Sequence, residues 1–234
     1  KKLLNFINIK KKCRSFHEHN EDKVLFEIIN QIKNSKNVSI ISDAGTPAIS
    51  DPGYKLIREC SQQLIEYTLI PGPSSVISAA VMSGLPTDKF TFFGFVPKKL
   101  SDQEICFETI KNDNKTSIFF ESPKRLEKTI TNLIKVIGKT RRVSICKEMT
   151  KLHEQIFRGS ISEILEDIKK EKILLKGEMV IVVEGAQKNN INYILDKNTK
   201  KEFLKKLSAS DAAKLISLIT GHNKRDVYKN LIEI

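Results

Sequence analysis

The spacing of apolar residues in the first third of the chain alternates between helical and strand periods. Apolar positions at helical spacing predict helices over residues 22–33, 51–63 and 74–83. Two short apolar or β-branched runs, each followed by a turn-rich loop, predict buried strands over residues 38–42 and 66–70. This alternation predicts an α/β lobe over residues 1–87, with parallel strands joined by right-handed crossovers.

A second α/β pattern begins at about Thr87. Apolar and aromatic runs predict strands over residues 90–97, 116–120, 142–146 and 179–183. A polar helix-like stretch predicts a helix over residues 102–111, and further helices are predicted over residues 124–137, where apolar positions are periodic, and 161–172. The pattern therefore predicts a second lobe over residues 88–187. A polar linker over residues 188–200 and a helical extension over residues 201–234, broken at Gly221-His222-Asn223, follow it.

The charge balance changes this picture in one respect. The 234 residues carry 40 basic and 28 acidic side chains, and this net charge of +12 favours an anionic partner such as nucleic acid. However, 33 of the basic residues are lysines and 7 are arginines, a bias that A/T-rich coding produces without selection for binding. Nucleic-acid surfaces commonly use arginine for bidentate phosphate contacts. Both explanations of the charge therefore remain open.

Composition and termini define the class of protein. The apolar and charged fractions, 40% and 29%, are those of a globular protein and exclude collagen-like, coiled-coil and wholly disordered chains. No apolar run is long enough for a membrane span, and the first residues do not resemble a secretory signal. The four cysteines include no C-x-x-C pair, so they are expected to be core or boundary residues, without a metal site. These features predict a cytoplasmic protein.

Two loops at predicted strand ends carry candidate binding chemistry. The first, residues 42–53, contains two glycines, two prolines and two aspartates after a strand. Such a loop presents backbone N–H groups and a carboxylate to a ligand, but it is equally typical of a tight turn with Thr46 and Asp51 as caps. The second, residues 71–75, opens a helix, where free N–H groups suit an adenine ring, a ligand carboxylate or ordinary capping.

Three later segments place charged residues next to apolar strands. They are Glu121-Ser122 with Arg125, residues 147–151, and Lys176-Gly177-Glu178. Acidic and basic groups at three adjacent strand ends could converge on one cleft and adjust the acidity of a hydroxyl group. The alternative is a structural network of ion pairs at the sheet edge. The His17-x-His19 pair lies in a polar lead to a helix, which favours a turn or surface position over a metal site.

In combination these segments resemble one family. Similarity extends from about Lys2 to Ile232 and depends most on Asp43-Ala44-Gly45-Thr46-Pro47 and Gly177-Glu178-Met179-Val180. Further matching segments are Phe16–Glu21, Asp51-Pro52-Gly53, Pro71–Ser74, Ser83–Asp88, Phe120–Pro123 with Arg125-Leu126, and Lys147–Lys151. The sequence resembles the ribosomal RNA small subunit methyltransferase I family of the tetrapyrrole methylase fold, whose members methylate a cytidine ribose 2′-hydroxyl in 16S rRNA.

The resemblance implies a two-lobed α/β fold, each lobe a mixed sheet flanked by helices, with a helical C-terminal extension. It implies S-adenosylmethionine as cofactor, a decoding-centre cytidine in the small ribosomal subunit as target, a homodimer, and no metal. By motif position, the implied catalytic residues are Glu121, Lys147 and Glu148. The implied cofactor-binding residues are Asp43, Ala44, Gly45, Thr46, Ile49, Ser74, Ser75, Phe120, Gly177 and Glu178. The implied RNA-binding residues are Arg125, Lys151, Lys224 and Arg225.

The sequence departs from the family pattern at its start. Family members begin with a strand and a Thr-Pro-Ile-Gly-Asn type loop, followed by an Ala-Glu-Asp-Thr-Arg type segment, which this chain lacks. These parts are expected to contact the cofactor and target nucleotide, so the implied site is an incomplete set. Two other functions remain open: a methyltransferase of the same fold acting on a tetrapyrrole or a translation-factor side chain, and a non-catalytic RNA-binding subunit.

Overall fold

The computed structural model describes residues 2–17, 19–42, 45–187 and 195–232. The chain divides into two compact units, Lys1–Gly185 and Ala186–Ile234. No helix in these described ranges combines the length and apolar character that a membrane crossing requires. The first unit contains the sheet and the candidate site, and it is described first.

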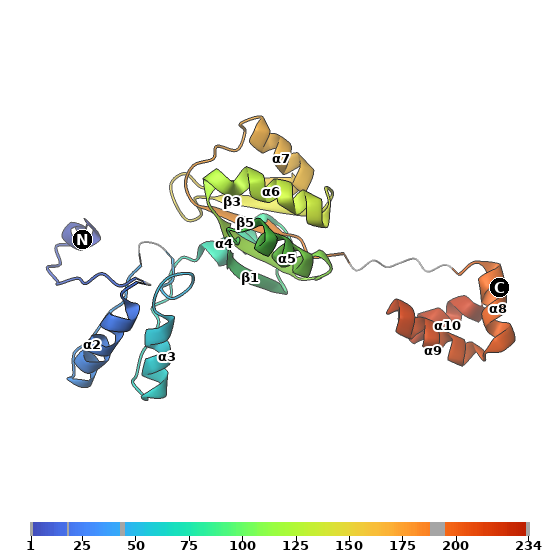
Figure 1. Ribbon diagram of the computed structural model, residues 1–234, viewed down its shortest axis with the longest axis horizontal. Coiled ribbons are helices and arrows are strands. Elements are labelled where there is room, and N and C mark those ends of the chain that lie inside the picture. The colour runs from blue at the N-terminus through green and yellow to red at the C-terminus, as the bar shows by residue number, and fades with distance from the viewer. Residues whose placement is uncertain (1, 18, 43–44, 188–194, 233–234) are drawn as a thin grey trace. The chain divides into compact units, whose positions relative to one another are not determined.

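A five-stranded mixed sheet forms the centre of the first unit (Figure 1). Its strands are β1 (Phe90–Phe95), β2 (Thr116–Glu121), β3 (Arg142–Lys147), β4 (Gln155–Ser160) and β5 (Met179–Val183). The spatial order is β1-β2-β5-β3-β4; β1 and β2 are parallel, whereas the other neighbours are antiparallel. The mixed sheet confirms the predicted fold class and four of the predicted strands, whereas β4 was not predicted.

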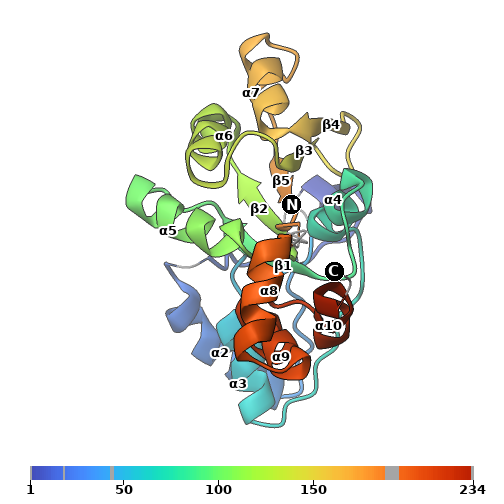
Figure 2. The same ribbon diagram turned by 90° about the vertical axis from the view of Figure 1, so that its right-hand side faces the viewer.

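Helices cover both faces of this sheet (Figure 2). One face packs against α5 (Leu100–Lys111), α6 (Pro123–Ile137) and α7 (Ile161–Lys169), in a core that includes Phe107, Phe119 and Ile130. The other face packs against α4 (Ser75–Ser83), whose small residues let the helix lie close to the strands. The sheet is therefore buried on both sides, which explains why its central strands are continuous apolar runs.

The N-terminal part of this unit differs from the prediction. It contains α1 (Lys2–Phe6), α2 (Glu21–Lys33) and α3 (Tyr54–Gln62), and the last two pack side by side around Ile29 and Leu56 (Figure 1). The strands predicted over residues 38–42 and 66–70 are wrong for the described residues, because neither segment pairs with another strand. Extended backbone becomes a strand only when a neighbour takes up its N–H and C=O groups. Without one, Ile70 is 87% exposed.

The second unit is a small helical bundle. It contains α8 (Lys197–Lys206), α9 (Ala209–Thr220) and α10 (Lys224–Ile232), packed around Ala213, Ile216 and Leu231. The predicted break at residues 221–223 separates α9 from α10, with Gly221 in the left-handed conformation. A second break precedes α9, where Ser208 caps the helix by accepting a hydrogen bond from the Asp211 N–H. Helix α8 begins inside the predicted linker, most of which lies outside the described residues.

All four cysteines are free thiols. Cys60 and Cys146 are buried, and Cys106 is half-buried. Cys13 is exposed, so the expectation of a core or boundary position is wrong for that residue.

Candidate functional site

The strand register brings the three charged segments to one edge of the sheet. Glu121 at the end of β2 and Lys147 at the end of β3 both pair with Met179, the first residue of β5. Directly paired residues point to the same face of a sheet, so Glu121 and Lys147 flank the Met179 side chain. We call this edge, where β1, β2 and β3 end and β5 begins, the carboxyl edge. The charged segments meet at this edge, where they form the ion pairs Arg125–Glu121, Lys151–Glu148 and Lys151–Glu178, as the alternative of a structural network requires. That they also line a cleft stays a prediction.

Glu121 is the most buried charged group at the carboxyl edge, with 3% of its surface exposed. Its Oε1 accepts a hydrogen bond from the Ser122 N–H at 2.7 Å, and its Oε2 accepts one from Thr129 Oγ1 at 2.6 Å. The same Oε2 lies 3.4 Å from Arg125 Nη2. A carboxylate engaged at both oxygens has little capacity to accept a substrate proton, so this geometry favours a positioning role for Glu121.

Arg125 links Glu121 to the turn that follows β1. Its Nη2 donates hydrogen bonds to the carbonyl oxygens of Val96 and Pro97, at 2.9 and 2.6 Å. Gln103 also donates to the Pro97 carbonyl, at 2.8 Å, and accepts from Asn132. This buried network fixes the 96–99 turn against α5 and α6. Gln103 was not among the predicted site residues, because an isolated glutamine in a helix gives no motif.

Lys147 and Glu148 are candidates for proton transfer with different surroundings. Lys147 is largely buried, and its Nζ donates to Gln155 Oε1 at 3.3 Å. Glu148 begins the turn after β3 with a left-handed φ of 48°. Its Oε1 accepts hydrogen bonds from the Glu178 N–H at 2.7 Å and from Lys151 Nζ at 3.1 Å. No hydrogen bond to its Oε2 is found within the described part of the chain.

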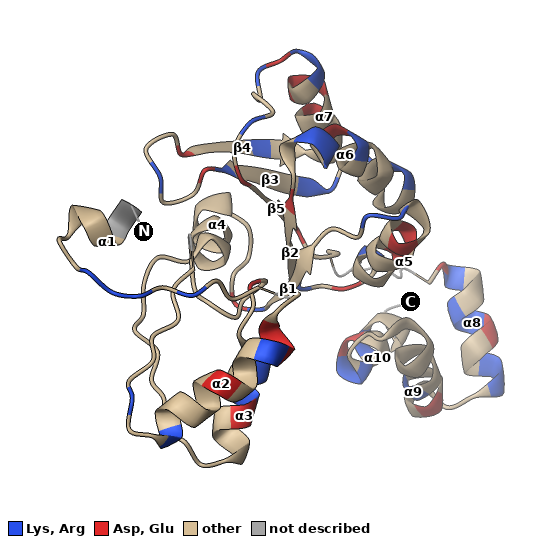
Figure 3. Cartoon of the chain, turned by 60° about the vertical axis from the view of Figure 1, so that its left-hand side comes forward, with Lys and Arg blue, Asp and Glu red and all other residues tan. Residues whose placement is uncertain are grey.

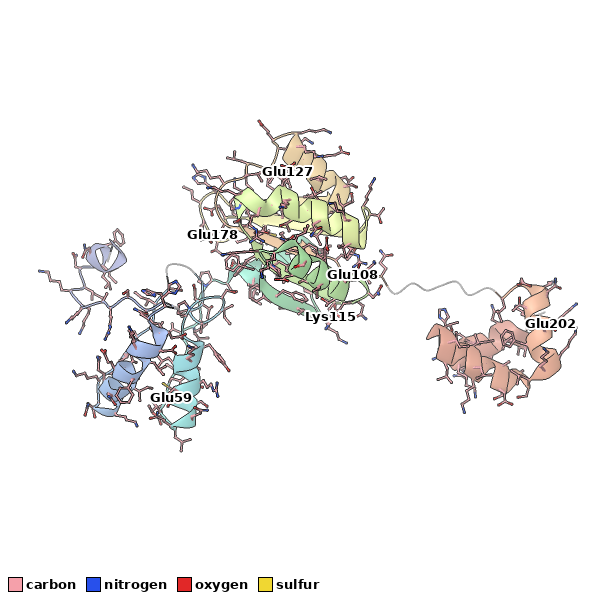
Figure 4. All side chains as sticks on the ribbon, viewed as in Figure 1. Glu59, Glu108, Lys115, Glu127, Glu178 and Glu202 are labelled. Carbon is pink, nitrogen blue, oxygen red and sulfur yellow. The ribbon has the colours of Figure 1, made fainter. Side chains whose placement is uncertain are left out.

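The turns that contain Glu148 and Glu178 hold each other in place. Lys151 Nζ lies 2.9 Å from Glu178 Oε2 (Glu178 is labelled in Figure 4), and the Glu148 N–H donates to the Glu178 carbonyl. The Glu178 N–H, and after it the Lys151 ammonium, hold the pKa of the Glu148 carboxyl below its ordinary value. Glu148 is therefore an anion at neutral pH that fixes the start of β5.

The predicted cofactor loop over residues 42–53 is an unusually strained segment. Asp43 and Ala44 lie outside the described residues, whereas Gly45, Ala48, Ser50 and Gly53 all have left-handed φ angles. Thr46 and Ile49 lie between them, and Ile49 is exposed. Glycine adopts such φ angles readily, but Ala48 and Ser50 do not, so the surrounding structure must impose the conformation of these two residues. The loop is consistent with a binding role that needs a fixed backbone.

Two contacts place this loop. Buried Glu21 accepts a hydrogen bond from the Gly53 N–H at 3.1 Å, so α2 anchors the end of the loop. Ser50 Oγ lies 3.7 Å from the position that a Cβ at Gly94 would occupy, so the loop also approaches β1. Glu21 matched the family pattern but had no predicted role, because a glutamate at a helix start is commonplace.

The second predicted loop forms a helix cap. Ser74 is the N-cap of α4 and accepts a hydrogen bond from the Ile77 N–H at 3.5 Å. The N–H groups of Ser75 and Val76 have no partner within the described ranges. Two free donors at a helix start favour a negatively charged group. Capping and ligand binding are therefore compatible at this position.

The predicted cofactor residue Phe120 belongs to a group of aromatic rings. Its ring contacts Phe92 and Phe95 edge to face, with centroids 4.9 and 5.4 Å apart. Phe92 and Phe120 pack on the α4 face, whereas Phe95 is 58% exposed. The exposed ring was not predicted as a site residue, because the aromatic run 90–95 reads as an ordinary strand.

The remaining predicted RNA contacts lie in different units. Arg125 and Lys151 belong to the first unit, where both make the contacts given above. Lys224 and Arg225 begin α10 in the second unit; Lys224 Nζ lies 3.2 Å from Ser210 Oγ, and the Arg225 N–H is capped by Asn223. Basic residues occur on α6, α7, α8 and α10 (Figure 3).

Metal ligation finds no support in the described residues, where no group of three or more histidine, cysteine, aspartate or glutamate side chains could hold an ion. His17 and His19 are both exposed, with ring centroids 5.9 Å apart. This pair lies at the surface, in agreement with the sequence prediction.

Comparison with known proteins identifies relatives over most of the chain. Residues 2–165 match the family of Tetrapyrrole (Corrin/Porphyrin) Methylases. The protein named ribosomal RNA small subunit methyltransferase I of Thermotoga maritima is 44% identical over 185 residues, which cover 79% of this chain and 82% of the relative. The protein of that name in Escherichia coli O157:H7 is 33% identical over 232 residues, covering 99% of this chain and 81% of the relative.

Solved structures agree with this fold at low sequence identity. Diphthine synthase superposes with a TM-score of 0.58 at 16% identity, covering 78% of this chain and 72% of that structure. The methyltransferase CobJ superposes with a TM-score of 0.54 at 15% identity, covering 76% of this chain and 74% of that structure. At such identities the likeness concerns the fold alone.

Proposed function

The chain belongs to the tetrapyrrole methylase family and, within it, to the family of ribosomal RNA small subunit methyltransferase I; from this premise we propose that it methylates a cytidine ribose 2′-hydroxyl in 16S rRNA. The proposed methyl donor is S-adenosylmethionine, and the proposed target is a cytidine of the decoding centre. The supporting observation is the 44% identity to a relative of that name over 82% of the relative's length. No comparable observation supports a tetrapyrrole or a translation factor as substrate.

The residues at the two loops fit S-adenosylmethionine. The free N–H groups of Ser75 and Val76 suit its methionine carboxylate, with Ser74 holding the helix start in place. The strained loop with Gly45, Thr46 and Ile49 offers backbone groups in a fixed conformation. We propose that these residues hold the cofactor together with Asp43, Ala44, Phe120, Gly177 and Glu178. When bound, the cofactor supplies a methyl group on a sulfonium centre, which a nucleophilic oxygen attacks directly.

The chain's own contribution to the reaction is alignment and removal of the hydroxyl proton. Of the three predicted catalytic residues, Glu121 has both oxygens engaged, so we propose that it positions Arg125 and the 96–99 turn. Lys147 and Glu148 remain the proposed proton acceptors. Glu148 Oε2 is the better placed of the two, because Lys147 is largely buried and hydrogen-bonded to Gln155.

We propose that the protein acts in the cytoplasm as a homodimer and that its physiological substrate is the assembled small ribosomal subunit. Arg125, Lys151, Lys224 and Arg225 are the proposed RNA contacts in this assembly. Size-exclusion chromatography with light scattering tests the dimer, and a monomeric mass at working concentrations contradicts it.

Methyl transfer to isolated subunits tests the function. Small subunits from cells that lack the protein are incubated with the purified protein and methyl-labelled S-adenosylmethionine, and the rRNA is examined by mass spectrometry. We expect one 2′-O-methyl group at one cytidine. Subunits from wild-type cells are the matched control and should gain none, because the position is already modified.

Two results contradict the proposal. If calorimetry shows that the protein binds S-adenosylmethionine but unmodified subunits acquire no label, then the small ribosomal subunit is not the substrate. If the protein binds no S-adenosylmethionine, the non-catalytic RNA-binding function replaces the methyltransferase. Label that appears in a tetrapyrrole or a translation factor instead of rRNA identifies the remaining alternative.

A further inference from the structure

A β-bulge in β1 turns the Phe95 side chain toward the α4 face of the sheet. From Phe92 to Phe95 the strand advances three residues, whereas its partner β2 advances only two, from Ile118 to Phe120. Gly94, with a φ of +72°, absorbs the extra residue. As a result Phe92 and Phe95 both contact Phe120, although regular alternation would place them on opposite faces. Bulges commonly re-aim a side chain beside an active site.

The redirected ring is exposed rather than buried. Phe95 is 58% exposed, and its ring makes a T-shaped contact with the Phe120 ring, with centroids 5.4 Å apart. An aromatic ring that is supported from one side and open to solvent on the other is a surface on which a planar base can stack. Core packing does not explain a phenylalanine at this position, because more than half of its surface is exposed to solvent.

The turn after Phe95 is rigid and carries two lysines. Arg125 and Gln103 fix its carbonyl groups at Val96 and Pro97 through the hydrogen bonds described above. Lys98 and Lys99 follow, both exposed and without an ion pair in the described part of the chain. The nearest acid in sequence is Asp102, which is hydrogen-bonded to Ser101. Two exposed lysines therefore follow the ring by three and four residues, after a backbone segment that is held in place at Val96 and Pro97.

Helix stability does not explain these cations. Lys99 is the N-cap of α5, whose first turn contains Asp102, and Lys124 lies in the first turn of α6, which carries no acidic residue. The positive end of a helix dipole disfavours cations, and acidic or small polar residues are the usual choice at such positions. Arg125 ties the start of α6 to the 96–99 turn, so the two helix starts lie together. Lys98, Lys99 and Lys124 outnumber the one acidic residue at these helix starts, Asp102, and this excess of positive charge favours an anionic ligand.

The position of the ring relates it to the proposed reaction. Ser50 of the strained loop approaches Gly94, the residue before Phe95. We propose that Phe95 with Lys98, Lys99 and Lys124, which we call the Phe95 platform, binds a single-stranded nucleotide of the RNA substrate. The base stacks on Phe95 and the flanking phosphates contact the lysines. The inference rests on the proposed rRNA substrate and identifies where that substrate meets the first unit.

Two variants test the ring. Phe95→Leu keeps an apolar side chain but removes the π face, whereas Phe95→Tyr keeps the face. With small subunits as substrate, Phe95→Leu should lower kcat/KM about 5- to 100-fold, mainly through KM, because one stacked base is lost. Phe95→Tyr should lose much less activity than Phe95→Leu, because the tyrosine ring can still stack on a base. The S-adenosylmethionine Kd, measured by calorimetry, should stay within about twofold for both variants.

Charge reversal tests the lysines. Lys98→Glu with Lys99→Glu should lower kcat/KM and reduce the slope of its logarithm against log salt by about 1.4, or 0.7 for each lost phosphate contact. The matched control is Lys135→Glu with Lys139→Glu, two exposed lysines at the other end of α6. The control should keep both the rate and the salt slope, since it makes the same change of net charge far from the platform.

Three outcomes overturn the inference. Equal activity of Phe95→Leu and wild type shows that no base stacks there. A loss of S-adenosylmethionine affinity equal to the loss of activity shows that the ring holds the cofactor's adenine instead. Equal effects of the two charge reversals show that only net charge matters. Direct binding of a fluorescent single-stranded RNA oligonucleotide, measured by anisotropy for the same variants, tests the platform even if the wild type transfers no methyl group to subunits.

Discussion

The Glu148 carboxylate occupies the space that any side chain at Gly177 would need. A Cβ built on Gly177 lies 2.7 Å from Glu148 Cδ and 2.7 Å from its Oε1, the atom that accepts the Glu178 N–H. The φ of Gly177 is +87°, which also favours glycine. Gly177 is therefore needed because it has no side chain. The absence of a side chain lets the Glu148 carboxylate, from the turn after β3, accept a hydrogen bond from the Glu178 backbone N–H.

Gly177→Ala should destabilise the fold more than Gly84→Ala does. Gly84 is left-handed, with φ 72° and ψ 15°, and a Cβ there would find its nearest atom, Arg158 Nε, at an ordinary contact distance of 3.8 Å. Both variants incur about 1–2 kcal/mol for a left-handed alanine. Only Gly177→Ala adds about 1–3 kcal/mol for displacing Glu148. Urea unfolding measures both free energies, and equal losses would show that Glu148 moves away without cost.

Glu148→Gln should reduce the dependence of stability on pH. The pKa of Glu148 is lowered in the folded protein, so its ionised form stabilises the fold above the unfolded pKa. That contribution is lost as pH falls through the folded pKa. The melting temperatures of wild type and Glu148→Gln should therefore differ at pH 7 and converge as the pH falls through the lowered pKa of the folded state.

A matched glutamate controls for the change of charge. Glu127 is exposed on α6 and forms no ion pair in the described residues (Figure 4). Glu127→Gln should leave the melting temperature close to that of the wild type at every pH tested. A constant difference between wild type and Glu148→Gln across pH 3–7 would be evidence against the stabilising role of the Glu148 anion.

Glu121→Ala should destabilise the protein by about 3–5 kcal/mol, because the half-buried Arg125 and the buried Thr129 lose their common acceptor. Thr129→Val removes one donor and should cost about 1 kcal/mol. Chemical denaturation measures both, and a double-mutant cycle gives the coupling between the two residues. If Glu121→Gln instead keeps full stability and loses kcat alone, Glu121 is the base and not a positioning residue.

Lys224→Glu with Arg225→Glu should weaken methyl transfer to small subunits without changing S-adenosylmethionine affinity. Both residues are exposed at the start of α10, in the second unit. The control is Lys197→Glu with Lys201→Glu on α8, which changes the net charge of the same unit equally. Activity assays and calorimetry compare the pairs. Equal losses would indicate general attraction to RNA, and no loss would make α10 a structural element.

The sequence by itself determined the elements whose hydrophobic period is long and regular. Helices α2, α6 and α7 and strands β2 and β5 follow directly from apolar spacing, because each buries a continuous stripe or run. The meeting of three charged segments at the carboxyl edge was also predictable, since each follows or precedes such a strand. Family membership followed from the order of the motifs.

Tertiary structure decided everything that depends on a partner distant in sequence. Residues 38–42 have a strand pattern but no strand neighbour in the described chain, whereas β4 has a weak pattern, QIFRGS, and becomes a strand because β3 pairs with it. The role of Glu121 depends on Thr129 and Arg125, whose contacts exist only once α6 packs on the sheet. The exposure of Phe95 depends on one extra residue in β1, a register that only pairing with β2 defines. Apolar spacing reports which residues are buried, but hydrogen-bond partners and register are set when separate elements meet.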